Sequence, residues 1–156
     1  MFTELLSNYA LIGGLIAWGI AQTIKIPIDY LQTHKWDWAL LFQAGGMPSS
    51  HSALVVGVTH GVGLTAGFNS PSFALGFMMC MVVLYDATGI RRQAGLHAEL
   101  INAMIEDLAT GHRLKNEQLK EVLGHSPLEV FSGILLGLAV AQVTFTGDRI
   151  TGVRAN

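Results

Sequence analysis

Charged residues are scarce in this chain. Asp, Glu, Lys and Arg make up 13% of its 156 residues, whereas apolar residues make up 51%. An ordinary soluble domain carries about 25% charged residues, so this composition excludes that class and indicates a membrane protein. Nine basic residues against eleven acidic ones leave a net charge of −2. This balance excludes the overall positive field that attracts nucleic acid, and we expect no nucleic-acid partner.

The chain also has a single cysteine and lacks an N-terminal basic region. Cys80 is the single cysteine and lies inside an apolar run, so an internal disulfide is excluded and the side chain is interpreted as a small buried hydrophobe. No Lys or Arg precedes the first apolar run, and no small-residue cleavage pattern follows it. We therefore expect no removable signal peptide.

Long apolar runs dominate what is present. Four segments have the length of a membrane-spanning helix, about 17 to 22 residues. They run approximately from Tyr9 to Ile28, Ser49 to Phe68, Ser72 to Thr88 and Pro127 to Phe145. A further segment, Leu96 to Leu108, has its apolar residues on one helical face, which is typical of an amphipathic helix. We predict a single domain over residues 1–156 that is an all-α integral membrane helical bundle, with about four transmembrane helices plus this amphipathic interfacial helix.

The distribution of basic residues predicts the orientation of the bundle in the plasma membrane. With the N-terminus outside, two basic residues lie outside and seven lie on the cytoplasmic side, so the positive-inside rule favours both termini outside. The same threading places the end of the first span, the start of the second, the end of the third and the start of the fourth on the cytoplasmic face. The seven inner residues are Lys25, Lys35, Arg91, Arg92, Arg113, Lys115 and Lys120.

The polar clusters that interrupt the apolar pattern all fall on this predicted inner face. They are Lys25, the stretch from Pro48 to Ser52, DATGIRR from Asp86 to Arg92, and GHSPLEV from Gly124 to Val130. Two clusters stand at helix N-termini, where backbone N–H groups and the helix dipole favour an anion. Arg91 and Arg92 add forked donors suited to phosphate oxygens. With His51 and His125 nearby, the set indicates phosphoryl transfer, with one imidazole as nucleophile and the other as acid.

Three stretches carry a family resemblance. GGMPSSHSA, DATGIRRQAG and GHSPLEVFSG resemble the signatures of the divergent branch of the type-2 phosphatidic acid phosphatases, which are relatives of acid phosphatases and vanadium haloperoxidases. The resemblance covers nearly the whole chain. In the order of the wider superfamily pattern, it implies that Lys25 is the first-motif lysine and that His51 is the histidine of the second motif, here GGMPSSHSA. His125 is then the nucleophile of the third motif, here GHSPLEVFSG, and Glu129 is the carboxylate four residues beyond it.

The chain departs from the wider superfamily pattern at several positions. Ser50 stands where the superfamily has glycine, Glu129 replaces an aspartate, and Leu119 stands where an arginine precedes the nucleophile. No Arg-Pro pair follows the first-motif lysine. We interpret Arg91 and Arg92 as substitutes for the missing arginines.

The resemblance implies a metal-independent lipid phosphate phosphatase that acts through a phosphohistidine. His125 attacks phosphorus, Glu129 holds its ring, and His51 protonates the leaving alkoxide and then activates water. The scheme requires neither a metal nor another cofactor, and its partner is a phosphorylated membrane lipid in the bilayer. Larger family members have about six spans, so a homo-oligomer that completes the pocket stays open. The phosphate oxygens would be held by Lys25, Ser49, Ser50, Arg91 and Arg92.

Two of these motifs also have structural interpretations. The run from Ser126 to Glu129 matches a capping box with proline at the first helical position, so Glu129 serves the helix start, the orientation of His125, or both. Ser49 and Ser50 serve either as caps of the second span or as phosphate ligands.

Arg91 and Arg92 also have two interpretations. They serve either as phosphate ligands or as anchors at the inner membrane face.

Other polar and small residues fit helix packing. His60 lies deep in the second span, and we interpret it as a helix-packing hydrogen-bond partner. Two pairs have the small-xxx-small spacing that favours close helix contact: Gly57 with Gly61, and Gly133 with Gly137.

A second class of function stays open at this stage. A non-catalytic membrane protein that binds a phosphorylated lipid or an anion, or a small transporter subunit, also aims helix N-termini at anions. Binding alone needs cations and dipoles but neither nucleophile nor acid. His51, His125 and Glu129 therefore distinguish the phosphatase hypothesis from this alternative.

Overall fold

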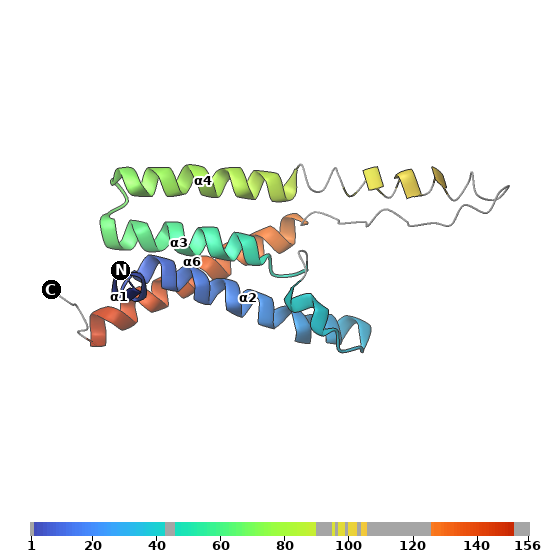
Figure 1. Ribbon diagram of the computed structural model, residues 1–156, viewed down its shortest axis with the longest axis horizontal. Helices are drawn as coiled ribbons and strands as arrows, with labels where there is room; N and C mark the ends of the chain where they lie inside the picture. Colours follow the sequence, from blue (N-terminus) through green and yellow to red (C-terminus); the bar gives the residue numbers. More distant parts are fainter. Residues whose placement is uncertain are drawn as a thin grey trace.

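The chain folds as a bundle of long helices (Figure 1). The computed structural model describes residues 2–42, 46–89, 95, 97, 98, 100–102, 104, 105 and 126–151, and no strand occurs among them. This confirms the all-α prediction. The elements are α1 (Phe2–Leu6), α2 (Tyr9–Thr33), the 3-10 helix η1 (Trp38–Leu41), α3 (Ser50–Ala66), α4 (Pro71–Thr88) and α6 (Pro127–Thr151).

Three of the described helices are long and apolar enough to cross a membrane. They cover Tyr9–Leu31, Pro71–Thr88 and Pro127–Gly147, and they confirm three of the four predicted spans and an integral membrane protein. The remaining predicted span, Ser49 to Phe68, forms α3, whose 17 residues rise about 26 Å. This is slightly less than the roughly 30 Å of a hydrocarbon core, so α3 is the short member of the bundle. Within the predicted amphipathic helix, Leu96–Leu108, the residues that the structure describes are helical.

Polar residues at the helix starts explain the helix boundaries. The side chains of Asn8, Ser49 and Ser70 each accept a hydrogen bond from a backbone N–H three residues on, at 3.1, 3.3 and 3.2 Å. Each therefore satisfies an N–H group that has no partner inside its helix. At the other end of α3, Gly67 has a φ of 94°, which favours glycine, and the helix stops there.

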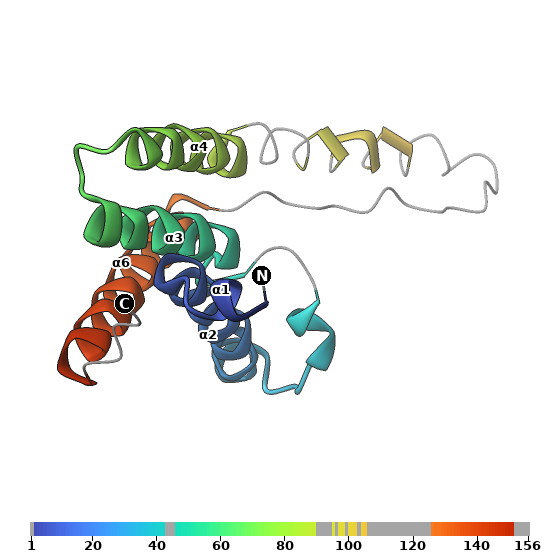
Figure 2. The same cartoon turned by 60° about the vertical axis from the view of Figure 1, so that its left-hand side comes forward.

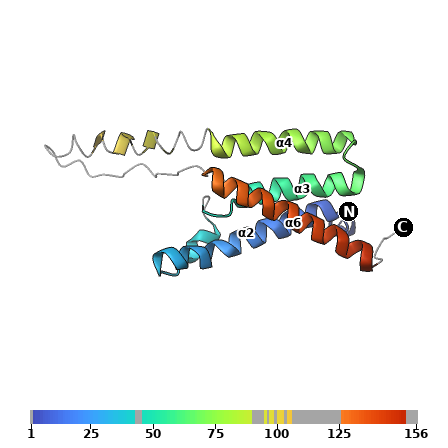
Figure 3. The ribbon, with the colours of Figure 1, turned by 180° about the vertical axis from the view of Figure 1, so that it is seen from behind.

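The four long helices alternate in direction. Helices α2 and α4 run toward the end of the bundle at which α3 and α6 begin, and α6 runs back toward the end at which α2 begins (Figures 1 and 3). Helix α4 lies on the outer side of α3, away from α2 (Figure 2). The predicted polar helix ends of α2, α3 and α6 therefore meet at one end of the bundle.

Small residues bring α2, α3 and α6 close together. Ala17, Ala21 and Ala53 form the buried core between them. A Cβ added to Gly61 would lie 2.7 Å from the Ala10 Cα, and one added to Gly137 would lie 2.6 Å from the Ala53 carbonyl oxygen. Only glycine allows backbones this close, so the predicted small-xxx-small contacts are confirmed.

A polar contact also joins α3 and α6 on the outer side of the bundle, where His60 is half-buried and Gln142 is exposed. The His60 Nε2 atom lies 3.2 Å from the Gln142 Oε1 atom, and the His60 ring packs 5.8 Å from the Phe68 ring. The interpretation of His60 as a helix-packing residue is confirmed.

Gly133 of α6 lies close against the start of α3, and this contact yields a stability prediction. A Cβ there would meet the Ser49 carbonyl oxygen and lie 2.9 Å from the Ser52 Cβ, so neither neighbour is a flexible side-chain end. We expect Gly133→Ala to lower the free energy of unfolding by about 1–3 kcal/mol, measured by denaturant titration in detergent micelles. The matched control is Gly19→Ala on α2, where an added Cβ meets nothing within 4 Å. Equal unfolding free energies for the two variants would contradict the close contact.

Candidate functional site

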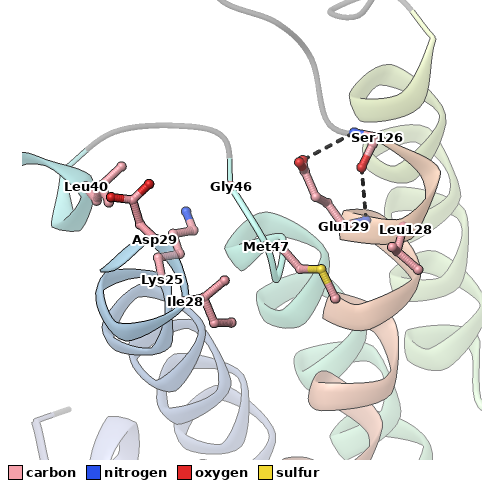
Figure 4. Close-up of a pocket in the computed structure, with 9 residues that line it drawn as sticks. All are labelled: Lys25, Ile28, Asp29, Leu40, Gly46, Met47, Ser126, Leu128 and Glu129. Carbon is pink, nitrogen blue, oxygen red and sulfur yellow. Dashed lines mark hydrogen bonds between the residues drawn. The ribbon is translucent and has the colours of Figure 1, made fainter. Parts of the chain in front are cut away.

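A cavity of about 270 Å³ lies at the end of the bundle where α2 ends and α3 and α6 begin. Lys25 and Asp29 reach the cavity from α2, and Ser126 and Glu129 reach it from the start of α6. Met47 reaches it from the segment that leads into α3 (Figure 4). Stretches far apart in the sequence, including two of the motifs that carry the resemblance, therefore meet at one cavity. Its described lining consists of Lys25, Ile28, Asp29, Leu40, Gly46, Met47, Ser126, Leu128 and Glu129.

Lys25 supplies the positive charge in the part of the cavity lining that the structure describes. The residue is only 2% exposed, and its Nζ donates to the Gln22 Oε1 at 2.6 Å and to the Ser50 Oγ at 3.4 Å. A buried charge is costly unless it is hydrogen-bonded, and these two partners meet that need. The Glu129 carboxylate on the α6 side also attracts the Lys25 ammonium.

Gly46 explains part of the glycine pair in the second motif. Its φ is 79°, which favours glycine. A Cβ placed there would lie 3.6 Å from the Lys25 Cδ. Gly46 therefore lies beside the methylene stem of Lys25, and its turn directs the chain from the cavity edge toward α3.

The serines of the second motif are structural contacts in this structure. Ser49 and Ser50 are buried and are not part of the described cavity lining. The Ser49 Oγ accepts from the Ser52 amide at 3.3 Å and from the Ser52 Oγ at 2.9 Å. The capping interpretation of Ser49 is therefore confirmed, while Ser50 is linked to the cavity through its contact with Lys25.

Glu129 has a confirmed structural role. The Ser126 amide donates to the Glu129 Oε2 at 3.2 Å, and the Glu129 amide donates to the Ser126 Oγ at 3.3 Å (Figure 4). This reciprocal pair is the predicted capping box, with Pro127 as the first helical residue. Because the Glu129 side chain also lines the cavity, one carboxylate both starts α6 and faces the cavity.

The remaining predicted site residues are placed only in part. His51 lies in the first turn of α3, is exposed, and is not among the described residues that line the cavity. His125, Arg91 and Arg92 lie outside the described residues. Ser126, which follows His125 in the chain, lines the cavity. The structure thus brings together Lys25 and Glu129 of the predicted set.

Two cavity-end residues were missed by the sequence analysis. Asp29 lines the cavity one helical turn beyond Lys25, and its Oδ2 accepts from the Thr33 Oγ1 at 3.3 Å. Gln22 lies one turn before Lys25 and holds its ammonium. The spacing of three and four residues around Lys25 is the signal that could have indicated both.

No metal centre is formed by the residues that the structure describes. Within that part of the chain, no three His, Cys, Asp or Glu side chains are arranged to hold a metal ion. The described part of the cavity instead presents one ammonium and two carboxylates, from Lys25, Asp29 and Glu129.

Comparison with known proteins assigns the family. The chain is 40% identical over 151 residues to Uncharacterized membrane protein YuiD of Bacillus subtilis (strain 168), and the alignment covers 90% of this chain and 96% of that protein. No solved structure gives a significant match. The sequence profile described as Divergent PAP2 family matches residues 6–140. That range includes every described residue of the cavity lining, and the chain belongs to the Divergent PAP2 family, as its motifs predicted.

Proposed function

We propose that the protein is a metal-independent lipid phosphate phosphatase that acts through a phosphohistidine intermediate. The observation that carries the proposal is the position of Lys25. Its buried ammonium lies at a cavity whose opposite wall is formed by Ser126 and Glu129 of the third motif. A fixed cation facing the start of a helix is an arrangement that favours a phosphate group.

The proposed reaction has two steps. In the first, a ring nitrogen of His125 attacks phosphorus, the bond from phosphorus to the lipid oxygen breaks, and His51 gives its proton to that oxygen. In the second, His51 takes a proton from water, the water oxygen attacks phosphorus, and the phosphorus–nitrogen bond breaks. The products are the lipid alcohol and inorganic phosphate, and both histidines return to their starting states.

The charges at the cavity support a role for the arginines. A phosphomonoester is a dianion, whereas the described lining carries the carboxylates of Asp29 and Glu129 beside the single ammonium of Lys25. Further positive charge is needed to bind such a substrate. Arg91 and Arg92 of the DATGIRRQAG motif are the proposed source, with forked donors for the phosphate oxygens.

The size of the cavity supports a lipid substrate bound by its headgroup. Its volume of about 270 Å³ is below the roughly 300–1,000 Å³ typical of sites that enclose a drug-sized ligand. Leu128 lines the cavity and is 63% exposed, so apolar surface adjoins the polar groups. The proposed substrate therefore places its phosphate in the cavity and leaves its chains in the bilayer.

One observation favours a second candidate function, a non-catalytic protein that binds a phosphorylated lipid or an anion. His51 is not part of the described cavity lining, and Glu129 is engaged in the capping box. Such a protein would bind phosphate at Lys25 but release none from a lipid. Turnover therefore separates the two candidates.

The first test is phosphate release from a panel of lipid phosphates by the purified protein in detergent. We expect His125→Ala to abolish release and His51→Ala to slow it by about 10²- to 10⁴-fold, because the lipid alkoxide needs a proton to leave. The control is His34→Asn, since His34 is not among the described residues that line the cavity and has a left-handed φ of 56°, which asparagine tolerates. Full activity of either His125→Ala or His51→Ala, at native expression, would reject the two-histidine mechanism.

The second test concerns the side of the membrane that the cavity faces. We propose that it opens to the cytoplasm, because the sequence threading assigns four basic residues outside the proposed site to the cavity side and two to the other side. Asn69 lies in the turn between α3 and α4, and this turn is at the end of the bundle opposite the starts of α3 and α6 (Figure 1). Asn116 follows α4 and precedes α6 in the sequence. In a Cys80→Ala background, single cysteines at these two positions are treated in intact cells with an impermeant thiol reagent.

The expected result is labelling of the cysteine at position 69 and protection of the cysteine at position 116. The reverse pattern would place the cavity on the outer face. Labelling after the membrane is permeabilised provides the control that each cysteine is reactive.

A further inference from the structure

Gln22 is a buried polar residue, and both the oxygen and the nitrogen of its side-chain amide have hydrogen-bond partners. It lies on α2, one turn before Lys25, and is 9% exposed. Its Oε1 accepts from the Lys25 Nζ at 2.6 Å, and its Nε2 donates to the Leu41 carbonyl oxygen at 3.0 Å. The side chain therefore connects the Lys25 ammonium with the end of η1.

The orientation of the Gln22 amide follows from its two neighbours. An ammonium can only donate, and a carbonyl oxygen can only accept. A flipped amide would place its NH₂ group against the Lys25 ammonium and its oxygen against the Leu41 carbonyl. The Leu41 contact thus fixes the Gln22 oxygen toward Lys25.

This contact constrains a side chain that is otherwise flexible. A lysine has a four-carbon stem and carries about 2 kcal/mol of rotamer entropy. Gln22 and Ser50 take two of the three hydrogen-bond donors of Lys25 among the described residues, which leaves one for a ligand in the cavity. Both partners are neutral, so they hold the ammonium without cancelling its charge.

We propose that Gln22 is a positioning residue for phosphate binding and acts through the Lys25 ammonium. The inference rests on the proposed function, in which Lys25 binds the phosphate group. A fixed cation binds an anion more tightly than a mobile one, because less freedom is lost on binding. Leu40 of η1 lines the cavity, so the same contact also holds the η1 wall beside Lys25.

The test is the dissociation constant of inorganic phosphate, measured by titration calorimetry on the purified protein in detergent. We expect Gln22→Met, which removes both hydrogen bonds, to weaken binding about tenfold. The matched control is Gln142→Met. It makes the same change and removes the contact with His60 on α3, but Gln142 is not part of the described cavity lining. We expect this control to bind phosphate as tightly as the wild type does.

Two further variants separate positioning from folding. Gln22→Glu keeps an acceptor for Lys25, but its charge offsets the ammonium and its second oxygen faces the Leu41 carbonyl, so we expect weaker phosphate binding than in Gln22→Met. Adding Gln22→Met to Lys25→Met should cause no further loss, because the effect of Gln22 passes through Lys25. Additive losses would overturn the inference.

The outcomes also distinguish this inference from the proposed function. Wild-type binding that Lys25→Met weakens but both Gln22 variants leave unchanged would overturn the role of Gln22 alone. Wild-type protein that does not bind phosphate, or binding that Lys25→Met leaves unchanged, would overturn the proposed role of Lys25 and the inference with it.

Discussion

The contact between the first turns of α3 and α6 is the constraint on which the candidate site depends. The Ser49 amide donates to the Glu129 carbonyl oxygen at 2.9 Å, and this approach is possible because Gly133 has no side chain to separate the helices. The contact places the start of the second-motif helix beside the start of the third-motif helix. Lys25 then reaches the same region from α2 and contacts Ser50. Without this contact, the second and third motifs would not line a common cavity.

The same region shows how one residue can have both a structural and a chemical role. Glu129 begins α6 through its capping box, and its carboxylate lines the cavity that holds Lys25. A cap fixes the side chain in position, because both partners belong to one helical turn. The proposed orientation of His125 by Glu129 would use a carboxylate that the helix start already holds in place. The structural and functional interpretations of this motif are therefore compatible.

Sequence patterns predicted the elements of this fold better than they predicted the cavity. Apolar runs predicted α2, α3, α4 and α6. The capping box and the glycine spacings could also be predicted, because each is a pattern of residues within one helix. The cavity lining depends on how far each helix is rotated about its axis and on where η1 packs. The roles of Asp29 and Gln22 follow from that tertiary arrangement, and Gln22 is linked to η1 through a backbone carbonyl that no side-chain pattern reveals.

The central claim is that the family's third-motif histidine carries the phosphoryl group during turnover. The most direct measurement is to mix the purified protein with a lipid phosphate labelled with ³²P, stop the reaction in alkali, and locate the label by peptide mapping. The account predicts an acid-labile, alkali-stable label on the peptide that contains His125, and none on protein that was denatured before mixing. Rapid phosphate release without any labelled protein, or a label on a carboxylate or hydroxyl side chain, would contradict it.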